Sequence, residues 1–227
     1  MGILFNFLNK YKVPILIVIL IILARTLFLS YYSIPSNSMY PSLESNDVVF
    51  GYHIKSEKDI TTGDIYTFSV EKDGNNITMI KRLIGKPGDT ISYKSSDQNF
   101  YINGEPISRK AVDLEPDRVN RIYKKHGHKN FVYFEEKLPN GRSYISMYSD
   151  FSEHSSNLVE KYLNKDFSYT LENDEYFFLG DNRHYSADSR YYGVVNYNDI
   201  KSKITRNIAN REFLFNEDQR FFFEKII

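Results

Sequence analysis

Two short segments hold side chains that could act as a hydroxyl nucleophile and an amine base. Residues 34–43 read IPSNSMYPSL, and the two prolines restrict the backbone around Ser36 and Ser38. Residues 79–89 read MIKRLIGKPGD, in which Lys81 stands inside an apolar stretch typical of a strand. A lysine that shares a strand face with methionine and leucine either snorkels to solvent or is held there for its chemistry.

A third segment, residues 180–195 (GDNRHYSADSRYYGVV), is dense in aspartate, asparagine, serine and arginine. This composition is typical of a loop held by side-chain hydrogen bonds and ion pairs. The chain has 5 histidines and 0 cysteines, and no histidine lies in HExxH or in another recognised metal-ligand spacing. Patterns for phosphate-binding loops and for histidine-assisted serines (GxxxxGK[ST], GxGxxG and GxSxG) are also missing. We therefore expect no metal and no other cofactor.

The elements that must position these segments are predicted to be strands. The 227 residues include 19 tyrosines and 17 phenylalanines, which favour β structure. Short apolar runs alternate with Asp-Gly, Pro-Gly and Asn-Gly turn signals, without long amphipathic helices. We expect a mainly β fold, an antiparallel sheet or barrel-like domain over residues 32–227, with residues 105–170 as an inserted or variable region. The expected strands are residues 48–52, 64–70, 77–85, 99–102, 130–134, 143–148 and 174–180.

An apolar run near the N-terminus predicts a membrane anchor over residues 11–31. It contains VPILIVILIILA, and about 20 predominantly apolar residues suffice to cross a bilayer. A cleaved signal peptide and a buried core helix are the alternatives, but no small-x-small cleavage site follows and the run is apolar all round. Lys10 and Lys12 precede the run, so the positive-inside rule places residues 1–10 in the cytoplasm and the domain outside.

The charge balance gives no support for nucleic-acid binding. Lys+Arg and Asp+Glu both number 29, so the formal net charge is zero. Nucleic-acid affinity depends largely on neutralising phosphates with excess cations. We therefore expect no nucleic-acid partner.

The three segments, in this order behind an apolar run, resemble the conserved boxes of type I signal peptidases from bacteria. That family shows P-S-x-S-M-x-P-[TS]-L, then I-K-R-x-x-G-x-P-G-D, then G-D-N-R-x-x-S-x-D-S-R, and all three are present. A weaker match, GDIYTF, lies at residues 63–68. The resemblance covers both ends of the domain but not residues 105–170. Each box alone could arise by chance, whereas three in the correct order are highly specific.

The resemblance implies a membrane-bound serine endopeptidase that removes N-terminal signal peptides from secreted and membrane preproteins. It implies a single-pass protein of the bacterial cytoplasmic membrane with its catalytic domain on the extracytoplasmic side. The implied partners are preprotein signal peptides and membrane lipid, with the secretion translocon close by.

Matching the boxes residue by residue implies individual roles. Ser38 matches the nucleophile, and Lys81 matches the general base. Ser36 matches the residue whose hydroxyl helps the Ser38 N–H to form the oxyanion hole. Ser186 matches a serine that hydrogen-bonds to the lysine and orients it. Asp188 and Arg190 match an ion pair that supports the site, and Asp181 matches a residue of the same supporting loop. Five residues match positions that line the small substrate pockets: Tyr32, Ile34, Pro35, Leu43 and Ile80.

The physical chemistry of serine and lysine agrees with these implied roles. A serine hydroxyl needs a base to become nucleophilic, and serine–lysine sites are a recognised variant of the catalytic triad. Free lysine has a pKa of about 10.4, so burial must lower the pKa by several units before the amine can act as a base.

The sequence departs from the common family pattern at three places. Asn37 stands between the two serines, and Thr62 replaces a frequent basic residue. His184 and Tyr185 replace the usual Asp/Asn pair, which predicts an altered geometry around Ser186.

Two other classes of protein remain as alternatives. One is a non-catalytic, membrane-anchored binding module on the same fold, which would be indicated by loss of Ser38 or Lys81. The other is a self-cleaving regulator of the LexA type, which also uses serine and lysine. That class lacks a membrane span and usually carries a DNA-binding head, and neither property fits this sequence.

Overall fold

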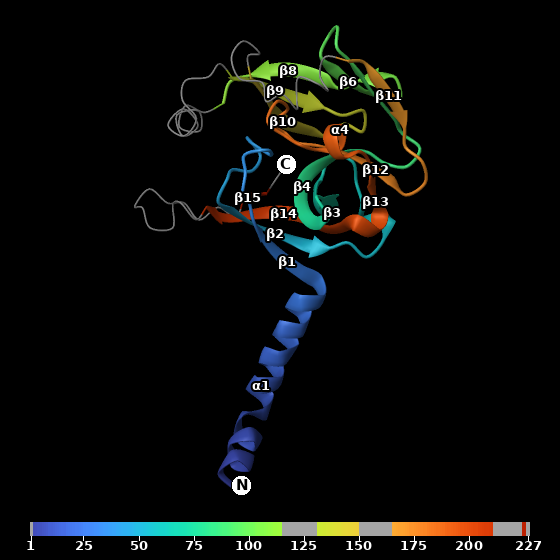
Figure 1. Ribbon diagram of the computed structural model, residues 1–227. Helices are drawn as coiled ribbons and strands as arrows, with labels where there is room; N and C mark the ends of the chain where they lie inside the picture. Colours follow the sequence, from blue (N-terminus) through green and yellow to red (C-terminus); the bar gives the residue numbers. More distant parts are fainter. Residues whose placement is uncertain (1, 115–130, 150–164, 211–223, 226–227) are drawn as a thin grey trace.

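An 8-stranded antiparallel sheet organises the domain that follows the N-terminal helix (Figure 1). The computed structural model describes residues 2–114, 131–149, 165–210 and 224–225. The strand order in the large sheet is β1-β2-β14-β3-β4-β12-β13, with β15 paired to β14. Its strands are β1 (Leu29–Ser33), β2 (Asp47–His53), β3 (Ile65–Lys72), β4 (Asn75–Gly85), β12 (Glu175–Leu179), β13 (Val195–Asn196), β14 (Ile200–Asn210) and β15 (Glu224–Lys225).

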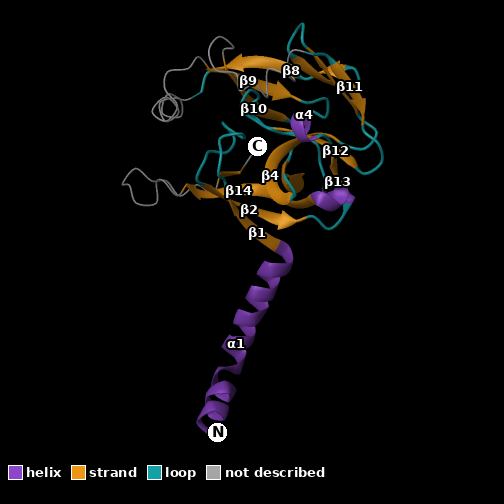
Figure 2. Cartoon of the chain, in the orientation of Figure 1, coloured by secondary structure: helices purple, strands orange, loops and turns teal. Residues whose placement is uncertain are grey.

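Two smaller antiparallel sheets lie on the side of the domain away from the helix (Figure 2). One has the order β10-β9-β8 and the other β11-β5-β6-β7. Their strands are β5 (Thr90–Lys94), β6 (Asn99–Ile102), β7 (Glu105–Pro106), β8 (Ser108–Val112), β9 (Phe131–Lys137), β10 (Ser143–Ser149) and β11 (Phe167–Thr170). Short helical turns complete the described chain: η1 (Glu57–Asp59), α4 (Ser189–Tyr192) and η2 (Tyr197–Asp199).

A continuous apolar core joins the small sheets to the large one. Ile84 of β4, Phe177 of β12, and Ile91 and Phe100 of the four-stranded sheet are each at most 4% exposed and pack in one cluster. Tyr144 of β10 enters the same cluster. The small sheets are therefore fixed relative to β4 and β12, which carry the candidate site.

The prediction of a mainly antiparallel β fold is confirmed. Each of the seven expected strands is present with ends that differ by at most a few residues. The prediction missed β14, although this strand pairs with both β2 and β3 near the middle of the large sheet. Lysines alternate with Ile200, Ser202 and Ile204 at its start, so only one face is apolar and the pattern resembles a surface segment.

The N-terminal helix α1 spans Gly2–Phe28 and projects from the domain (Figure 1). The predicted anchor, residues 11–31, extends beyond this helix into β1. The helix ends before residue 31 because β1 pairs with β2, with Tyr31 opposite Phe50 and Tyr32 opposite Val49. Within the part of the chain that the structure describes, no helix has the length and apolarity required to cross a membrane.

Candidate active site

The central contact of the site joins Lys81 to Ser38. Ser38 lies in the turn that follows β1, and Lys81 lies on β4. The Lys81 Nζ donates to Ser38 Oγ at 2.7 Å and to the carbonyl oxygen of Ile80 at 2.9 Å. Lys81 is only 3% exposed. A hydroxyl and a buried amine are thus in direct contact, as proton transfer between them requires.

Burial gives the Lys81 amine the protonation behaviour of a base. Burial lowers the pKa of Lys81 from 10.5 to about 8. The nearby carboxylates of Asp188 and Asp181 act in the opposite direction, and the Arg190 charge lowers the pKa further. A substantial fraction of Lys81 is therefore neutral in weakly alkaline solution.

The second serine of the turn lies next to the first. The Ser36 hydroxyl donates to Ser38 Oγ at 3.3 Å, and Ser36 is exposed. Asn37 connects the two serines, and its side-chain oxygen accepts from the Ser45 N–H at 2.8 Å. The departure at Asn37 thus stabilises the turn that presents Ser38.

The loop after β12 holds the backbone of the Ser38 turn. The Asn182 N–H donates to the Ser38 carbonyl oxygen at 3.1 Å, and its Nδ2 donates to the Asn37 carbonyl oxygen at 3.1 Å. A Cβ at Gly180 would lie 2.1 Å from Ser186 Oγ and 2.5 Å from the Ser38 carbonyl oxygen. Glycine is therefore required where the two segments meet.

Asp188 and Arg190 form the expected ion pair. The Arg190 Nε and Nη2 donate to the two Asp188 carboxylate oxygens, both at 2.7 Å. The same carboxylate accepts from the Gly180 N–H at 2.8 Å. Burial alone would raise the pKa of Asp188, but the Arg190 charge and these hydrogen bonds outweigh it and lower the pKa. The carboxylate therefore stays ionised and secures both ends of the loop.

Ser186 differs from the interaction that the resemblance implied. Among the described residues, the hydrogen bonds of the Lys81 amine go to Ser38 and Ile80, and none goes to Ser186. Ser186 is 5% exposed, and its hydroxyl instead lies beside Gly180 and the Asp188 carboxylate, whose pKa it helps to lower. The close approach of Gly180 accounts for this position, since the missing Cβ leaves room for the hydroxyl.

Sequence reasoning did not single out the partner of Asp181, which is Arg82. The Arg82 Nε and Nη2 donate to the Asp181 carboxylate at 2.8 and 2.7 Å, and both side chains are 1% exposed. Arg82 also donates to the Gly63 carbonyl oxygen at 2.6 Å and to Ser42 Oγ at 3.0 Å. Because Arg82 follows Lys81, this fork ties the lysine strand to the loop after β12.

Four of the five expected substrate-pocket residues lie in one apolar cluster. Ile34 and Leu43 are buried at 3% and 0% exposure, and Tyr32 and Ile80 pack against them. Pro35 is exposed and is not part of this cluster. The cluster includes Met39, the residue after Ser38, so this apolar cluster lies directly beside the serine.

Two strand edges flank the serine turn. β1 ends the strand order of the large sheet and, among the strands that the structure describes, pairs with β2 alone. β4 pairs with β12 only from Arg82 onwards, so residues 75–81 have a neighbour on one side alone, β3, among the described strands. Both edges can accept an added extended segment.

The described side chains include no group of three or more His, Cys, Asp or Glu residues that could hold a metal ion. The arrangement of a serine hydroxyl against a buried lysine amine is that of the serine–lysine hydrolases. Residues 8–208 match the family described as signal peptidase, peptidase S26. The chain belongs to this family.

Several curated relatives have the same description, signal peptidase I. The protein from Pseudomonas aeruginosa is 31% identical over 197 residues, and that from Rickettsia bellii (strain OSU 85-389) is 32% identical over 203 residues. These alignments cover 81% and 80% of this chain but only 62% and 66% of the two relatives. The protein from Streptococcus pneumoniae is 32% identical over 195 residues, which cover 86% of this chain and 89% of the relative.

Proposed function

We propose that the protein is a serine endopeptidase that cleaves N-terminal signal peptides from secreted and membrane preproteins, with Ser38 as nucleophile and Lys81 as general base. The observation that carries the proposal is the 2.7 Å contact between Ser38 Oγ and an amine whose pKa is lowered to about 8 by burial. Family membership supports the substrate class. A non-catalytic module would have no need to keep a buried lysine against a serine, because burial of the charged form costs free energy.

The reaction proceeds in two acyl-transfer steps. Neutral Lys81 takes the proton of Ser38 Oγ, which attacks the scissile carbonyl carbon and forms a tetrahedral intermediate. The Ser38 N–H and the Ser36 hydroxyl stabilise the oxyanion. The lysine ammonium then gives its proton to the leaving amine, and the acyl group stays on Ser38. Lys81 next removes a proton from water, the hydroxide attacks the ester, and Ser38 regains the proton as the signal peptide leaves with a free carboxylate.

The substrate binds in this proposal as an extended segment between β1 and β4. Main-chain hydrogen bonds to the two edges give affinity independent of side chains. The residues beside the cleavage point pack in this proposal on Tyr32 and Ile80, the half-buried members of the apolar cluster, which the buried Ile34 and Leu43 support from within. The closeness of the cluster to Ser38 favours small side chains. Pro35, which is exposed and lies outside that cluster, is a further proposed substrate contact.

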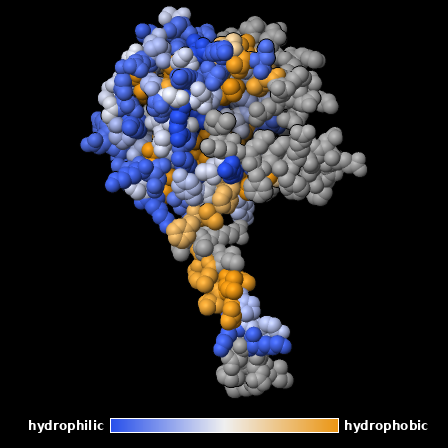
Figure 3. Space-filling view, turned by 180° about the vertical axis from the view of Figure 1, so that it is seen from behind, coloured by the Kyte–Doolittle hydropathy of each residue, from blue (hydrophilic) through white to orange (hydrophobic). Residues whose placement is uncertain are grey.

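We also propose a membrane-anchored position, with residues 1–10 in the cytoplasm, residues 11–31 as anchor and residues 32–227 on the extracytoplasmic side of the bacterial cytoplasmic membrane. In the described part of α1, Val13, Leu16 and Ile19 are 59%, 56% and 46% exposed. Figure 3 shows apolar residues gathered along this helix. Such surface is costly in water and is satisfied by lipid. This position brings the site close to emerging signal peptides and to the secretion translocon.

Extraction and protease accessibility test the membrane position. The full chain is expected to stay in the membrane pellet after alkaline carbonate treatment, and protease added to spheroplasts should digest the domain. Release by carbonate, or digestion in inverted vesicles alone, would contradict the anchor or its orientation.

A defined cleavage assay tests the enzymatic proposal. The purified full chain in detergent is incubated with a preprotein and with the same protein lacking its signal peptide. We expect a single cut in the preprotein, located by the masses of both products, and no cut in the mature form. Cleavage at many sites in both substrates, or none in either, would reject the proposal.

Replacing Ser36 with alanine is expected to slow cleavage without abolishing it. One oxyanion donor is typically worth about 10²–10³ in kcat, and the Ser38 N–H remains. The KM should change little, because the hydroxyl acts mainly on the transition state. Steady-state kinetics of Ser36→Ala beside Ser108→Ala, an exposed serine of β8, provide the measurement. A loss as complete as removal of the nucleophile would show that Ser36 has another role.

The rate of cleavage should rise with pH on the acid side of its profile. Only neutral Lys81 can accept the serine proton, and burial lowers its pKa to about 8. The value of kcat/KM should therefore increase tenfold per pH unit below about 8 and level off above it. A profile measured with a neutral peptide substrate gives the midpoint directly. A midpoint near 10.5, the ordinary lysine value, would contradict the role of Lys81 as a desolvated base.

A further inference from the structure

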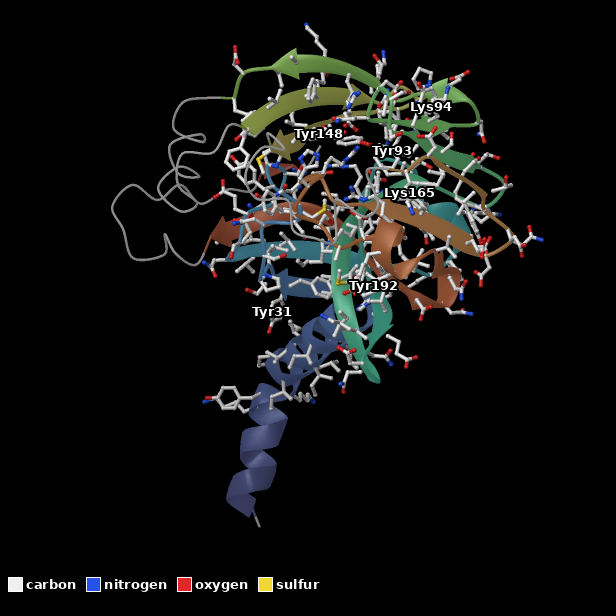
Figure 4. The ribbon with its side chains drawn as sticks, turned by 45° about the horizontal axis from the view of Figure 1, so that its top comes forward. Tyr31, Tyr93, Lys94, Tyr148, Lys165 and Tyr192 are labelled. Carbon is white, nitrogen blue, oxygen red and sulfur yellow. The ribbon has the colours of Figure 1, made fainter. Side chains whose placement is uncertain are left out.

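A buried charge network that extends from the third box to residues outside the matched boxes holds the loop that contacts Ser38. Glu136 of β9 and Arg183 form an ion pair at 2.6 Å, and both side chains are 1% exposed. Three hydroxyl groups of β10 surround the pair, those of Tyr144, Ser146 and Tyr148. They donate to the Glu136 carboxylate at 2.8, 2.8 and 2.9 Å. Figure 4 places Tyr148 between the three-stranded sheet and the rest of the domain.

Arg183 is held by two of the three hydroxyl groups that bind Glu136. Its Nη2 donates to Tyr144 at 2.8 Å, and its Nη1 donates to Tyr148 at 3.1 Å. Burial alone would raise the pKa of Glu136, but Arg183 and the hydroxyl donors lower it, so the carboxylate stays charged. Desolvating such a pair costs several kcal/mol per ion, and well-packed apolar residues often stabilise a fold equally well. Stability of the fold alone therefore does not account for this buried ion pair.

The three consecutive residues of the loop connect this network to the site. Asp181 binds Arg82, which follows Lys81 on β4. Asn182 binds the carbonyl oxygen of Ser38 through its N–H. Arg183 binds Glu136. Residues 181–183 therefore contact three parts of the molecule in turn: the lysine strand, the serine turn and the β9 carboxylate.

We propose that Glu136 is a positioning residue, which acts through Arg183 and Asn182 to fix Ser38 Oγ relative to the Lys81 amine. This inference rests on the proposed function. Backbone hydrogen bonds also join the loop to β10, from the Met147 N–H to the Asp181 carbonyl oxygen and from the Arg183 N–H to the Met147 carbonyl oxygen, at 2.8 and 2.9 Å. Loss of the carboxylate charge therefore leaves the loop attached but allows the Ser38 backbone to shift.

The substitution Glu136→Gln tests the proposal, because glutamine keeps the shape and loses the charge that pairs with Arg183. We expect kcat for preprotein cleavage by the folded full chain to fall about 10- to 100-fold, as misplacement on the scale of 1 Å does. The KM should change less than about threefold, since the substrate surface is untouched. The acid limb of the pH profile should keep its midpoint, because the groups acting on the Lys81 pKa are Asp188, Asp181 and Arg190.

The matched control is Glu135→Gln, the same chemical change at the exposed neighbouring position, which should behave as wild type. Hydrogen exchange gives a readout independent of activity. The Asn182 amide should exchange faster in Glu136→Gln than in the control. A kcat within twofold of wild type, a change confined to KM, or unchanged exchange at Asn182 would overturn the proposal.

A milder variant serves if Glu136→Gln does not fold. Tyr148→Phe removes one hydrogen bond from each member of the pair and keeps both charges. Its kcat should fall about three- to tenfold, whereas Tyr169→Phe, which removes an exposed tyrosine–glutamate hydrogen bond, should have no effect. Equal kcat in both variants would refute positioning by this network. A wild-type chain that fails to cleave any preprotein would instead reject the proposed function, and the Asn182 exchange comparison still decides the positioning.

Discussion

Replacing Ser38 with alanine is expected to reduce kcat for preprotein cleavage by about 10⁴- to 10⁶-fold, the range for removal of a catalytic nucleophile. Alanine cannot form the acyl intermediate, while Lys81 and the loop at Asn182 remain in place. The fold should persist, because the Ser38 side chain accepts only the hydrogen bonds from the Lys81 amine and the Ser36 hydroxyl among the described residues. Single-turnover kinetics at high enzyme concentration measure losses of this size.

The control for Ser38→Ala is Ser108→Ala, which should keep the wild-type rate. Circular dichroism and thermal unfolding verify that both variants fold. If folded Ser38→Ala retains more than about one hundredth of the wild-type kcat, another group carries out the attack, since removing a nucleophile costs far more. Substrate should still bind, so a preprotein trapped by Ser38→Ala without being cut would support the assignment further.

The sequence singled out Ser38 and Lys81 because they lie in three family boxes in the correct order, whereas each residue taken alone resembles an ordinary turn serine or a snorkelling strand lysine. Lys81 stands in an apolar strand, and Ser38 lies in a proline-restricted turn directly after an apolar run. Those local features are readable without knowledge of the fold. The structure places the two residues in contact across 43 positions of sequence.

The network around Glu136 could not be predicted in the same way. Along β10, Tyr144, Ser146 and Tyr148 alternate with Ile145 and Met147. Period-2 alternation suggests that the isoleucine and methionine face the core and that the hydroxyl side chains face water. In the structure the hydroxyl face is buried as well, with Tyr144, Ser146 and Tyr148 at 3%, 0% and 8% exposure.

Burial of that face depends on a partner that local pattern does not reveal. Glu136 and Arg183 are separated by 47 positions, and each resembles a surface charge in its own segment. A buried charge is tolerated only when its counter-charge and hydrogen-bond donors are present, and here they come from three separate segments. Residues 105–170 are predicted to be an inserted or variable region, and β9 and β10 within it supply the network that supports the serine turn. Residues 115–130 and 150–164 of that region lie outside the described residues.

Replacing Lys81 with methionine is expected to abolish catalysis and to stabilise the fold at neutral pH. Without a base the rate should fall by about 10⁴-fold or more. Methionine has a similar length and is apolar, so it fits the buried position. The matched control, Lys86→Met, changes an exposed lysine just beyond the same strand and should leave the rate unchanged.

The gain in stability follows from the lowered pKa of Lys81. The unfolded chain holds the lysine proton with the ordinary pKa of 10.5, and the folded chain holds it with a pKa of about 8, so below about pH 8 the buried charge destabilises the fold. That penalty corresponds to roughly 3 kcal/mol at neutral pH, and the loss of two hydrogen bonds offsets about 1–2 kcal/mol of it. Lys81→Met should therefore exceed wild type by roughly 1–2 kcal/mol in free energy of unfolding at pH 7.

The difference in free energy of unfolding between Lys81→Met and wild type should shrink as pH rises from about 8 to 10.5. In this range the lysine is protonated in the unfolded wild-type chain but largely neutral in the folded one, so wild type becomes more stable as pH rises. Urea denaturation of both proteins at pH 7, 9 and 10.5 measures this trend, with Lys86→Met as the reference. A stability difference independent of pH would mean that the folded lysine keeps its ordinary pKa. A lysine with that pKa would be almost fully protonated at neutral pH and unable to accept the serine proton, so this one denaturation series tests the base assignment without any substrate.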